Sequence, residues 1–413
     1  MRKWLVVTSV GGGPRTPIRP AWRRLHPLDA IAVALAVAGA GCVATGLLPR
    51  ADATATLTRI LPLLLFLGTV VVLAELTAAA GVFDVLATRL AVVSRGSWPA
   101  LFALCVGFAA LTTVVLNLDT TAVLLTPVML ALAVTLRTAV APLAVTTVWL
   151  ANTASLLLPV SNLTNLLAAD RVGLDPLAYA GVMWLPQLAA LAVTTVLLWY
   201  FWWRRDRPAT GRFAPPEVHR PADPVLYRTA LVACLLFVAG ILAGAPVGLA
   251  SAAAAALLLL GFALRFPGTL RPALLPWRLL VFVTGLFLVV QTIGQHGLDD
   301  LVAWLAGRDG GAPGALRAGG TGALLANLVN NLPAYLAVEA VLPAGDRQRL
   351  FALLIGTNVG PLALPWASLA TLLWLERCRA AGVAVPLARY LLTSAALAVL
   401  GTLAAIGTLL LTS

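Results

Sequence analysis

Lysine is almost absent from this chain of 413 residues, in which Lys3 is the only one. A Walker A loop needs a Gly-Lys-Ser/Thr run to hold phosphates, so the chain cannot be a P-loop ATPase. Charged residues make up only 11% of the sequence, against about 25% in a typical soluble domain, whereas hydrophobic residues reach 61%. Apolar runs near the roughly 20 residues that a membrane-spanning helix needs recur along the whole length. The composition predicts an all-α polytopic membrane protein.

Groups of metal-ligating side chains are absent as well. The cysteines stand singly in apolar segments and the three histidines have no partner motif, so we expect no metal site and no cofactor. The sequence has no paired His-Glu metal motif, no Ser/Lys dyad and no Gly-x-Ser-x-Gly elbow, which argues against an intramembrane enzyme. We interpret the four cysteines as small hydrophobic core residues: Cys42, Cys105, Cys234 and Cys378.

Positive charge is the sign in excess, with a formal net charge of +12. Such an excess can indicate nucleic-acid binding, but the arginines cluster in residues 1–29 and in the loop 204–220, as cytoplasmic segments of membrane proteins do. Residues 1–29 lack an uninterrupted apolar run, so we interpret them as a cytoplasmic tail rather than a signal peptide. We expect a multi-pass membrane protein with a cytoplasmic N-terminus and no nucleic-acid partner.

One polar pattern occurs twice inside the apolar sequence. In both copies six residues separate an asparagine from a proline, a run of small polar residues follows the proline, and an asparagine-containing segment comes before. The first copy comprises Asn117–Thr121, Asn152, Pro159 and Ser161–Asn165, and the second comprises Asn327–Pro333, Asn358, Pro365 and Ser368–Thr371. Such residues are costly at membrane depth unless they line a cavity. A duplicated helix-breaking pattern of this kind predicts the substrate site of a secondary transporter.

The repetition extends beyond the polar pattern. Glu75 and Gln291 each precede a glycine by six residues, in segments that otherwise match. A period this long indicates a duplicated helical bundle rather than a solenoid. The expected organisation is a cytoplasmic tail with the first membrane helix (1–54), a first repeat (55–203), a cytoplasmic linker with two connecting helices (204–278) and a second repeat (279–413).

The charges around the repeats predict that they are inverted. With a cytoplasmic N-terminus, the first repeat begins outside, after one span, whereas the second begins inside, after Arg278. Equivalent helices then enter from opposite sides, which defines an inverted-topology repeat. The same inverted topology places the uncharged C-terminus on the outer side of the membrane.

The polar segments resemble the ArsB-type arsenite permeases of the ion transporter superfamily. The matching segments are Asn117–Pro127, Leu158–Leu166, Asn330–Pro333 and Gly360–Trp374, within a resemblance that covers residues 55–385. The chain departs from the family pattern at Leu118, Trp366 and Ala367. These three positions flank the predicted site, so they bear on the substrate more than on the fold.

The resemblance implies a fold similar to the divalent-anion/sodium symporters, with about 11 transmembrane helices. Each inverted repeat would contribute a re-entrant hairpin and a broken helix that meet near the membrane midplane. We expect the hairpin tips at 117–121 and 330–333, and the helix breaks at 158–165 and 360–371. The implied function is export of arsenite or antimonite across the bacterial cytoplasmic (inner) membrane in exchange for protons, by alternating access.

Near neutral pH both metalloids are mostly uncharged trihydroxy species, held either by thiolates or by hydrogen bonds to their hydroxyls. The scattered cysteines argue against a three-thiolate site, so we expect recognition by Asn, Ser and Thr side chains and by free backbone groups. The candidate substrate-binding residues are Asn117, Asp119, Thr120, Asn152, Ser161, Asn162, Thr164, Asn165, Asn330, Asn331, Asn358, Ser368 and Thr371.

Two carboxylates are candidates for proton coupling. Asp119 stands at a predicted hairpin tip between apolar segments, where low polarity disfavours its charged form, so it could take up and release a proton as access alternates. The alternative is a purely structural helix cap. Glu75, near the end of a predicted span, is either a second cavity-lining carboxylate or an interfacial one.

Other interpretations remain open at this stage. Within the same superfamily, the chain could be an anion or dicarboxylate transporter or a sodium–proton transporter. It could also be the membrane subunit of an ATP-driven arsenite pump, with a soluble ATPase docked on the basic loop 204–220, although that loop is explained by topology alone. Asn330-Asn331-Leu-Pro333 could be a plain turn, but its duplication between apolar flanks favours a site.

Overall fold

The computed structural model describes residues 27–205, 211–343 and 345–412. Most of the predicted cytoplasmic tail and part of the basic loop therefore lie outside the described residues. The first half contains α1 (Pro27–Ala44), α2 (Arg50–Ala79), α3 (Val82–Val93), α4 (Trp98–Val115), α5 (Leu118–Thr135), α6 (Val140–Thr153), η1 (Pro159–Ser161), α7 (Leu163–Val172), α8 (Pro176–Leu198) and η2 (Trp199–Trp203). The second contains α9 (Pro224–Leu242), α10 (Val247–Arg265), η3 (Pro267–Thr269), η4 (Pro272–Leu274), α11 (Trp277–Ile293), η5 (Gly294–Leu298), α12 (Asp299–Ala306), α13 (Gly311–Val329), α14 (Asn331–Val341), α15 (Arg347–Val359), α16 (Leu369–Ala380) and α17 (Leu387–Thr412).

Several helices begin with a side-chain cap and a proline, which sets their boundaries. Asp175 accepts hydrogen bonds from two backbone N–H groups at the start of α8, and the proline that follows it has no N–H to leave unpaired. Asp223 caps α9 in the same way. The backbone N–H of Leu226, together with the Arg265 guanidinium, holds the pKa of Asp223 below its usual value.

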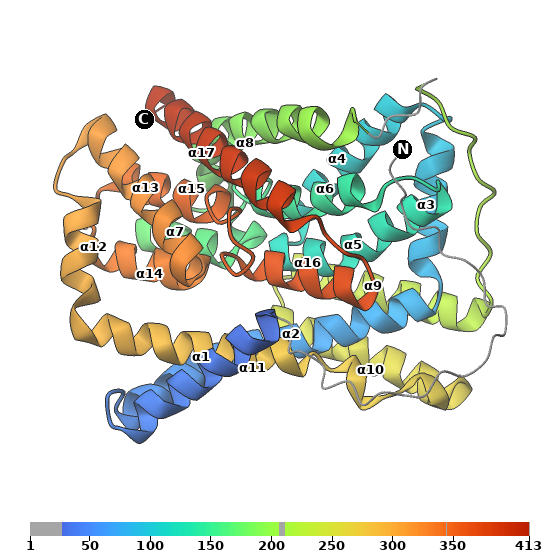
Figure 1. Ribbon diagram of the computed structural model, residues 1–413, viewed down its shortest axis with the longest axis horizontal. Helices are drawn as coiled ribbons and strands as arrows, with labels where there is room; N and C mark the ends of the chain where they lie inside the picture. The colour runs from blue at the N-terminus through green and yellow to red at the C-terminus, as the bar shows by residue number, and fades with distance from the viewer. Residues whose placement is uncertain (1–26, 206–210, 344, 413) are drawn as a thin grey trace.

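Most helices run along one axis, with α3 and α12 lying crosswise at the two ends (Figure 1). The end that carries residues 211–223 is called the linker face here, and the other end the opposite face. The described linker is held to the first half by a hydrogen bond of 3.1 Å from the Trp98 N–H to the Gly211 carbonyl. A second bond, also 3.1 Å, joins the His219 N–H to the Thr88 hydroxyl on α3.

Eight of the described helices have the length and composition to cross a bilayer. Two pairs, α4/α5 and α13/α14, fold back as hairpins, and α6–η1–α7 and α15–α16 are helices broken in the middle. If each hairpin and each broken helix counts once and the crosswise helices α3 and α12 are left out, the described residues form eleven membrane units. The predicted fold class, an all-α polytopic membrane protein with hairpins and broken helices, is confirmed.

The element order from α2 to α8 is repeated from α11 to α17 with the opposite direction through the bundle. The first chain turn of each copy uses a glycine with positive φ, Gly81 at 79° and Gly297 at 96°. The end of α2 meets the end of α16 on the linker face, through Glu75 and Arg377. The end of α7 meets the end of α14 on the opposite face, through Arg171 and Glu339. These contacts fit the inverted topology of the predicted fold class.

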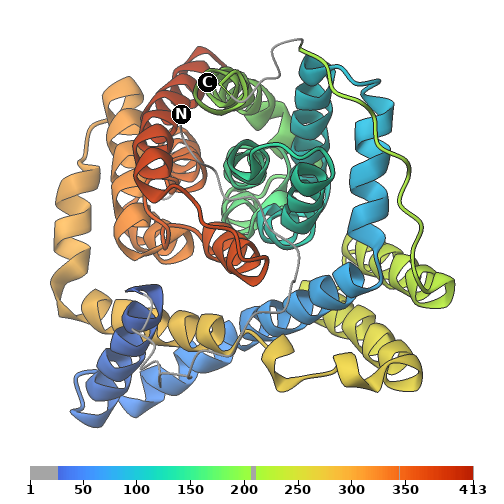
Figure 2. The same ribbon diagram turned by 45° about the vertical axis from the view of Figure 1, so that its right-hand side comes forward.

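The helices form two layers (Figure 2). We call α1, α2, α9, α10 and α11 the flanking layer, because α2 packs on α9, α10 and α11, and α11 packs on α1. The hairpins, the broken helices, α8 and α17 form the hairpin layer. At the α1–α11 crossing, a Cβ on Gly285 would lie 2.5 Å from the Ala36 backbone nitrogen, so only glycine permits this approach.

In the hairpin layer, α13 and α15 cross in close contact. A Cβ on Gly356 would lie 2.0 Å from the Gly319 carbonyl oxygen, and a Cβ on Gly360 would lie 2.4 Å from Cβ of Ala323. This crossing brings the second hairpin against the second broken helix. It therefore fixes the spacing of two elements that carry the duplicated polar pattern.

We expect Gly356→Ala to destabilise the protein, because a methyl group at this position must force α13 and α15 apart. Gly320→Ala on α13 is the matched control, since its Cβ would meet nothing within 4 Å. The control should be neutral or raise stability by up to about 1 kcal/mol, the usual gain of alanine over glycine in a helix. Thermal unfolding of the two purified variants in detergent measures the difference. Equal melting temperatures would show that the crossing tolerates separation.

Candidate functional site

Four helices, α5, α7, α14 and α16, begin at the same level inside the hairpin layer. Residues of the duplicated polar pattern stand at their N-terminal ends. Asn117 Oδ1 accepts a 2.7 Å hydrogen bond from the Thr120 N–H at the start of α5. Asn162 Oδ1 accepts one of 3.3 Å from the Thr164 N–H at the start of α7, and Ser368 Oγ accepts one of 3.1 Å at the start of α16. Asn330 precedes α14 with φ of 95° and ψ of 154°, a strained backbone conformation that is almost exclusive to glycine. Much of the predicted polar pattern therefore consists of helix caps.

The same level is where α4, α6, α13 and α15 end. Helix starts offer free N–H groups and a positive dipole end, and helix ends offer free carbonyls. A region where both kinds of termini meet presents donors and acceptors to a small solute without needing a charged side chain. This arrangement suits a neutral, hydroxyl-bearing ligand.

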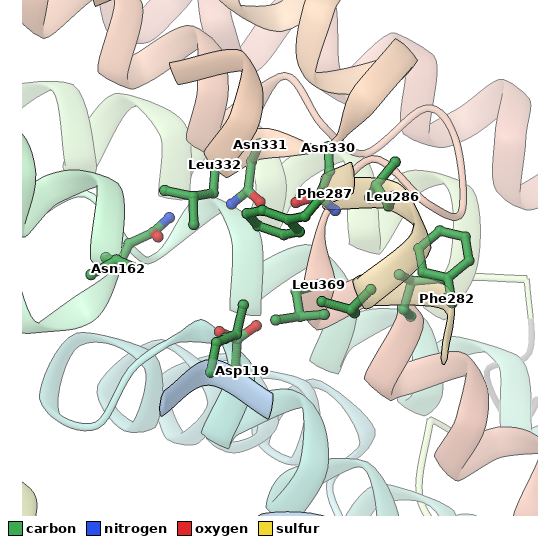
Figure 3. Close-up of a pocket in the computed structure, with 13 residues that line it drawn as sticks. Asp119, Asn162, Phe282, Leu286, Phe287, Asn330, Asn331, Leu332 and Leu369 are labelled. Atoms are coloured by element: carbon green, nitrogen blue, oxygen red, sulfur yellow. The ribbon is translucent and has the colours of Figure 1, made fainter. Parts of the chain in front are cut away.

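A pocket of about 40 Å³ lies between these termini and the flanking layer. Figure 3 shows the Asp119 carboxylate on one side of it, with the Asn162 and Asn331 side chains across the space. Its lining is Leu63, Asp119, Asn162, Leu163, Phe282, Val283, Leu286, Phe287, Asn330, Asn331, Leu332, Leu369 and Leu372. The four polar members come from both hairpins and one break, whereas α2 and α11 contribute the apolar cover. The lining contains no cysteine, arginine or lysine.

Four of the predicted substrate-binding residues line this pocket: Asp119, Asn162, Asn330 and Asn331. The other nine are buried in the polar layer that surrounds it: Asn117, Thr120, Asn152, Ser161, Thr164, Asn165, Asn358, Ser368 and Thr371. The hairpin tips lie at residues 116–117 and at Asn330, and the breaks lie between Thr153 and Leu163 and between Val359 and Leu369. These positions fall at or within a few residues of the predicted ones.

Asn358 ties the two repeats together behind the pocket. Its Oδ1 accepts hydrogen bonds from Asn162 Nδ2 at 3.0 Å and from Thr164 Oγ1 at 2.8 Å. Its Nδ2 donates to Asn165 Oδ1 at 2.6 Å. Asn165 Nδ2 in turn donates to the Ser155 and Leu158 carbonyls of the first break. An amide on α15 thus holds the unwound segment of the other repeat in place.

The second break is held from its own hairpin instead. Asn327 Nδ2 donates to the Gly360 carbonyl at 2.8 Å, and its Oδ1 accepts from the Leu364 N–H at 3.1 Å. Asn330 Nδ2 donates to the Trp366 carbonyl at 2.9 Å. Asn152, which matches Asn358 in the sequence pattern, makes one side-chain bond, to the Val148 carbonyl of its own helix. The duplication is therefore unequal in its hydrogen bonds.

The two predicted coupling carboxylates have different surroundings. Asp119 faces the pocket, and its Oδ1 is buried with no hydrogen-bond partner among the described residues. Glu75 lies outside the pocket and forms an ion pair of 2.6 Å with Arg377, which is 5% exposed. The Asp119 carboxylate is therefore available to a ligand or a proton, whereas the Glu75 carboxylate is occupied by its ion pair with Arg377 in this conformation.

Two further cavities adjoin the pocket on either side. One of about 630 Å³ extends toward the opposite face and shares Leu63, Leu163, Phe287 and Leu332 with the pocket. It is called the vestibule here, and Arg59 and Gln291 are among its polar lining residues. The other, of about 40 Å³, lies toward the linker face and shares Phe282 and Leu372. The site therefore opens widely toward one face only.

Some contributors could not be found from the sequence pattern. Gln187 on α8 braces the first break, because its Oε1 accepts from the Leu156 N–H and its Nε2 donates to the Thr153 carbonyl. The one available signal was a glutamine inside a long apolar helix. Phe282 and Phe287 cover the pocket from α11, and nothing in the sequence separates them from lipid-facing aromatics.

Comparisons with known proteins place this chain among membrane transporters. The sequence model of the citrate transporter family matches residues 21–371. The arsenical pump membrane protein of Escherichia coli is 31% identical over 331 residues, which cover 74% of this chain and 76% of that protein. The putative arsenical pump membrane protein of Bacillus subtilis is 27% identical, over 72% of this chain and 75% of its own length. The crystal structure of the Alcanivorax borkumensis YdaH transporter aligns with a TM-score of 0.43 and 15% identity, over 93% of this chain and 97% of that one. By sequence, the chain belongs to the citrate transporter family and to the ArsB-type permeases that the arsenical pump membrane proteins exemplify.

Proposed function

We propose that this protein exports arsenite and antimonite across the bacterial cytoplasmic membrane, in exchange for protons and by alternating access. The observation that supports this most is the pocket lining, which combines one carboxylate with three amides and lacks cationic side chains. The names of the relatives at about 30% identity point to the same substrate class.

The chemistry of the pocket favours a small neutral solute over an organic anion. Asparagine amides both donate and accept, so they complement the hydroxyls of a trihydroxy metalloid. Citrate is the substrate named by the family model. A tricarboxylate would need arginine or lysine partners for its charges, and it would face Asp119 instead. This difference supports arsenite and antimonite over di- and tricarboxylates.

Proton exchange is assigned to Asp119, which faces the solute space without a partner. Arginines concentrate at the linker face, including Arg265, Arg271 and Arg278, so we place that face in the cytoplasm together with the N-terminus. The conformation described here is then open to the outside, as expected after release of the exported solute. The residues 211–223 lie along α3 and α4, which leaves the linker face as the surface for a soluble ATPase if one docks.

The test is expression in an arsenite-sensitive host that lacks its own exporter. Cells carrying the protein should accumulate several-fold less arsenite than cells with empty vector, and a proton uncoupler should abolish the difference. Citrate uptake measured in the same cells should stay at background. Arsenite accumulation equal to that of the empty vector, with the protein present in the membrane, would contradict the proposed substrate.

A further inference from the structure

The ion pair between Glu75 and Arg377 joins the two layers on the linker face. Glu75 belongs to α2 in the flanking layer and Arg377 to α16 in the hairpin layer, and their side chains meet at 2.6 Å. Arg377 is 5% exposed and Glu75 is 33% exposed. Any opening between the layers on this face must separate these two charges.

The inverted repeats give this pair a counterpart on the opposite face. Arg171 and Arg377 each stand twelve residues after the proline of their break. Gln291 and Glu75 each stand six residues before the glycine that ends the first helix of their repeat. Arg171 lies on α7 in the hairpin layer and Gln291 lies on α11 in the flanking layer. The residues equivalent to the ion pair are therefore Arg171 and Gln291.

The counterpart contact is not formed in this conformation. Arg171 is held within the hairpin layer, where it donates to the Glu339 carbonyl at 2.6 Å and to the Leu342 carbonyl at 2.9 Å. Gln291 lines the vestibule of about 630 Å³. The face with the cross-layer ion pair is the closed one, and the face whose equivalent residues are apart is the open one.

We propose that Glu75 and Arg377 form a latch that keeps the linker face closed, and that Arg171 and Gln291 form the corresponding contact when the opposite face closes. Alternating access, on which the latch depends, is part of the proposed function. Because inverted repeats exchange conformations between the two faces, the contact on one face is broken when the equivalent contact on the other face forms. The two latches are unequal, since one is an ion pair and the other has a neutral glutamine. This difference biases the protein toward the conformation described here.

The test measures accessibility rather than transport. In a background without the four native cysteines, Ala337→Cys reports on the vestibule and Leu375→Cys reports on the cavity at the linker face. Each is labelled with a membrane-impermeant maleimide in oriented vesicles without substrate. Glu75→Gln should lower labelling at position 337 roughly threefold to tenfold and raise it at position 375. The charge swap of Glu75→Arg with Arg377→Glu should restore the original pattern.

A second variant adds a contact instead of removing one. Gln291→Glu offers Arg171 a carboxylate in the flanking layer that competes with its present partner Glu339 in the hairpin layer, so it should shift labelling in the same direction as Glu75→Gln without loosening the fold. Glu217→Gln, an exposed carboxylate in the linker, is the matched control and should change nothing. Unchanged labelling in both Glu75→Gln and Gln291→Glu would overturn the latch. Because no substrate is present, this result is independent of whether the protein exports arsenite.

Discussion

Replacing Asp119 with asparagine is expected to reduce proton-driven arsenite export to the level of the empty vector. The side chain keeps its size and can still donate and accept hydrogen bonds, but it can no longer bind and release a proton. Asp119 faces the pocket, and its Oδ1 has no partner among the described residues, so the substitution breaks no hydrogen bond of that oxygen. Buried carboxylates without partners at membrane depth are costly, and function is the usual reason for their presence.

The measurement is arsenite accumulation in the sensitive host with and without an uncoupler, together with arsenite binding to the purified variant. Asp170→Asn makes the same chemical change on an exposed carboxylate of α7 and should leave export intact. We expect Asp119→Asn to retain metalloid binding, because Asn162, Asn330 and Asn331 still line the pocket. Export at the wild-type rate by Asp119→Asn would disprove the coupling role. The carboxylate would then have only a structural role in the first turn of α5.

The second repeat supplies no substitute for this carboxylate. Asp119 is the second residue after the tip asparagine Asn117, and the corresponding residue after Asn330 is Leu332, which also lines the pocket. The pocket therefore carries one acid on the side of the first hairpin and an apolar residue on the side of the second. Loss of that single carboxylate should accordingly have a complete effect rather than a partial one.

The positions of the hairpins and breaks could be predicted because their signals are local. Asparagine, serine and proline interrupt apolar sequence at Asn117, Pro159, Asn330 and Pro365, and each interruption appears as a helix boundary within a few residues. Duplication made each signal stronger, since the same spacing recurs in the second half. The all-α membrane class and the duplication therefore followed from composition and pattern, whereas the assignment of the interruptions as hairpins and broken helices followed from the resemblance to the ArsB-type permeases.

The role of each polar residue could not be predicted in the same way. Asn162 lines the pocket, whereas Asn165, three residues later, turns away and bonds the Ser155 and Leu158 carbonyls. An unwound segment has no fixed period, so its spacing does not reveal which side chain faces the solute. The ion-pair partner of Glu75 could not be predicted either, because Arg377 lies in the other half of the chain.

Asn358→Leu is the second change for which we expect a large effect, in this case on stability. Leucine has a similar branched shape with the same number of side-chain heavy atoms, but it leaves the Asn162 amide, the Thr164 hydroxyl and the Asn165 side-chain carbonyl oxygen without the partner that Asn358 provides. A buried polar group left unpaired costs about 1–3 kcal/mol, although side-chain hydrogen bonds in membranes average nearer 0.6 kcal/mol. Three polar groups without hydrogen-bond partners should therefore lower the free energy of unfolding by roughly 2 kcal/mol or more.

The inverted repeats provide the control, because Asn152 occupies the matching position in the first copy. Its Oδ1 is buried without a partner among the described residues, and its Nδ2 bonds a carbonyl one turn back in its own helix. Asn152→Leu removes an unsatisfied acceptor and strands no other side chain, so it should leave the melting temperature unchanged or raise it slightly. Thermal unfolding in detergent compares the two variants directly. If both substitutions lowered the melting temperature equally, the cross-repeat hydrogen bonds of Asn358 would contribute no more than the single bond of Asn152. The first break would then be held mainly by Gln187 on α8.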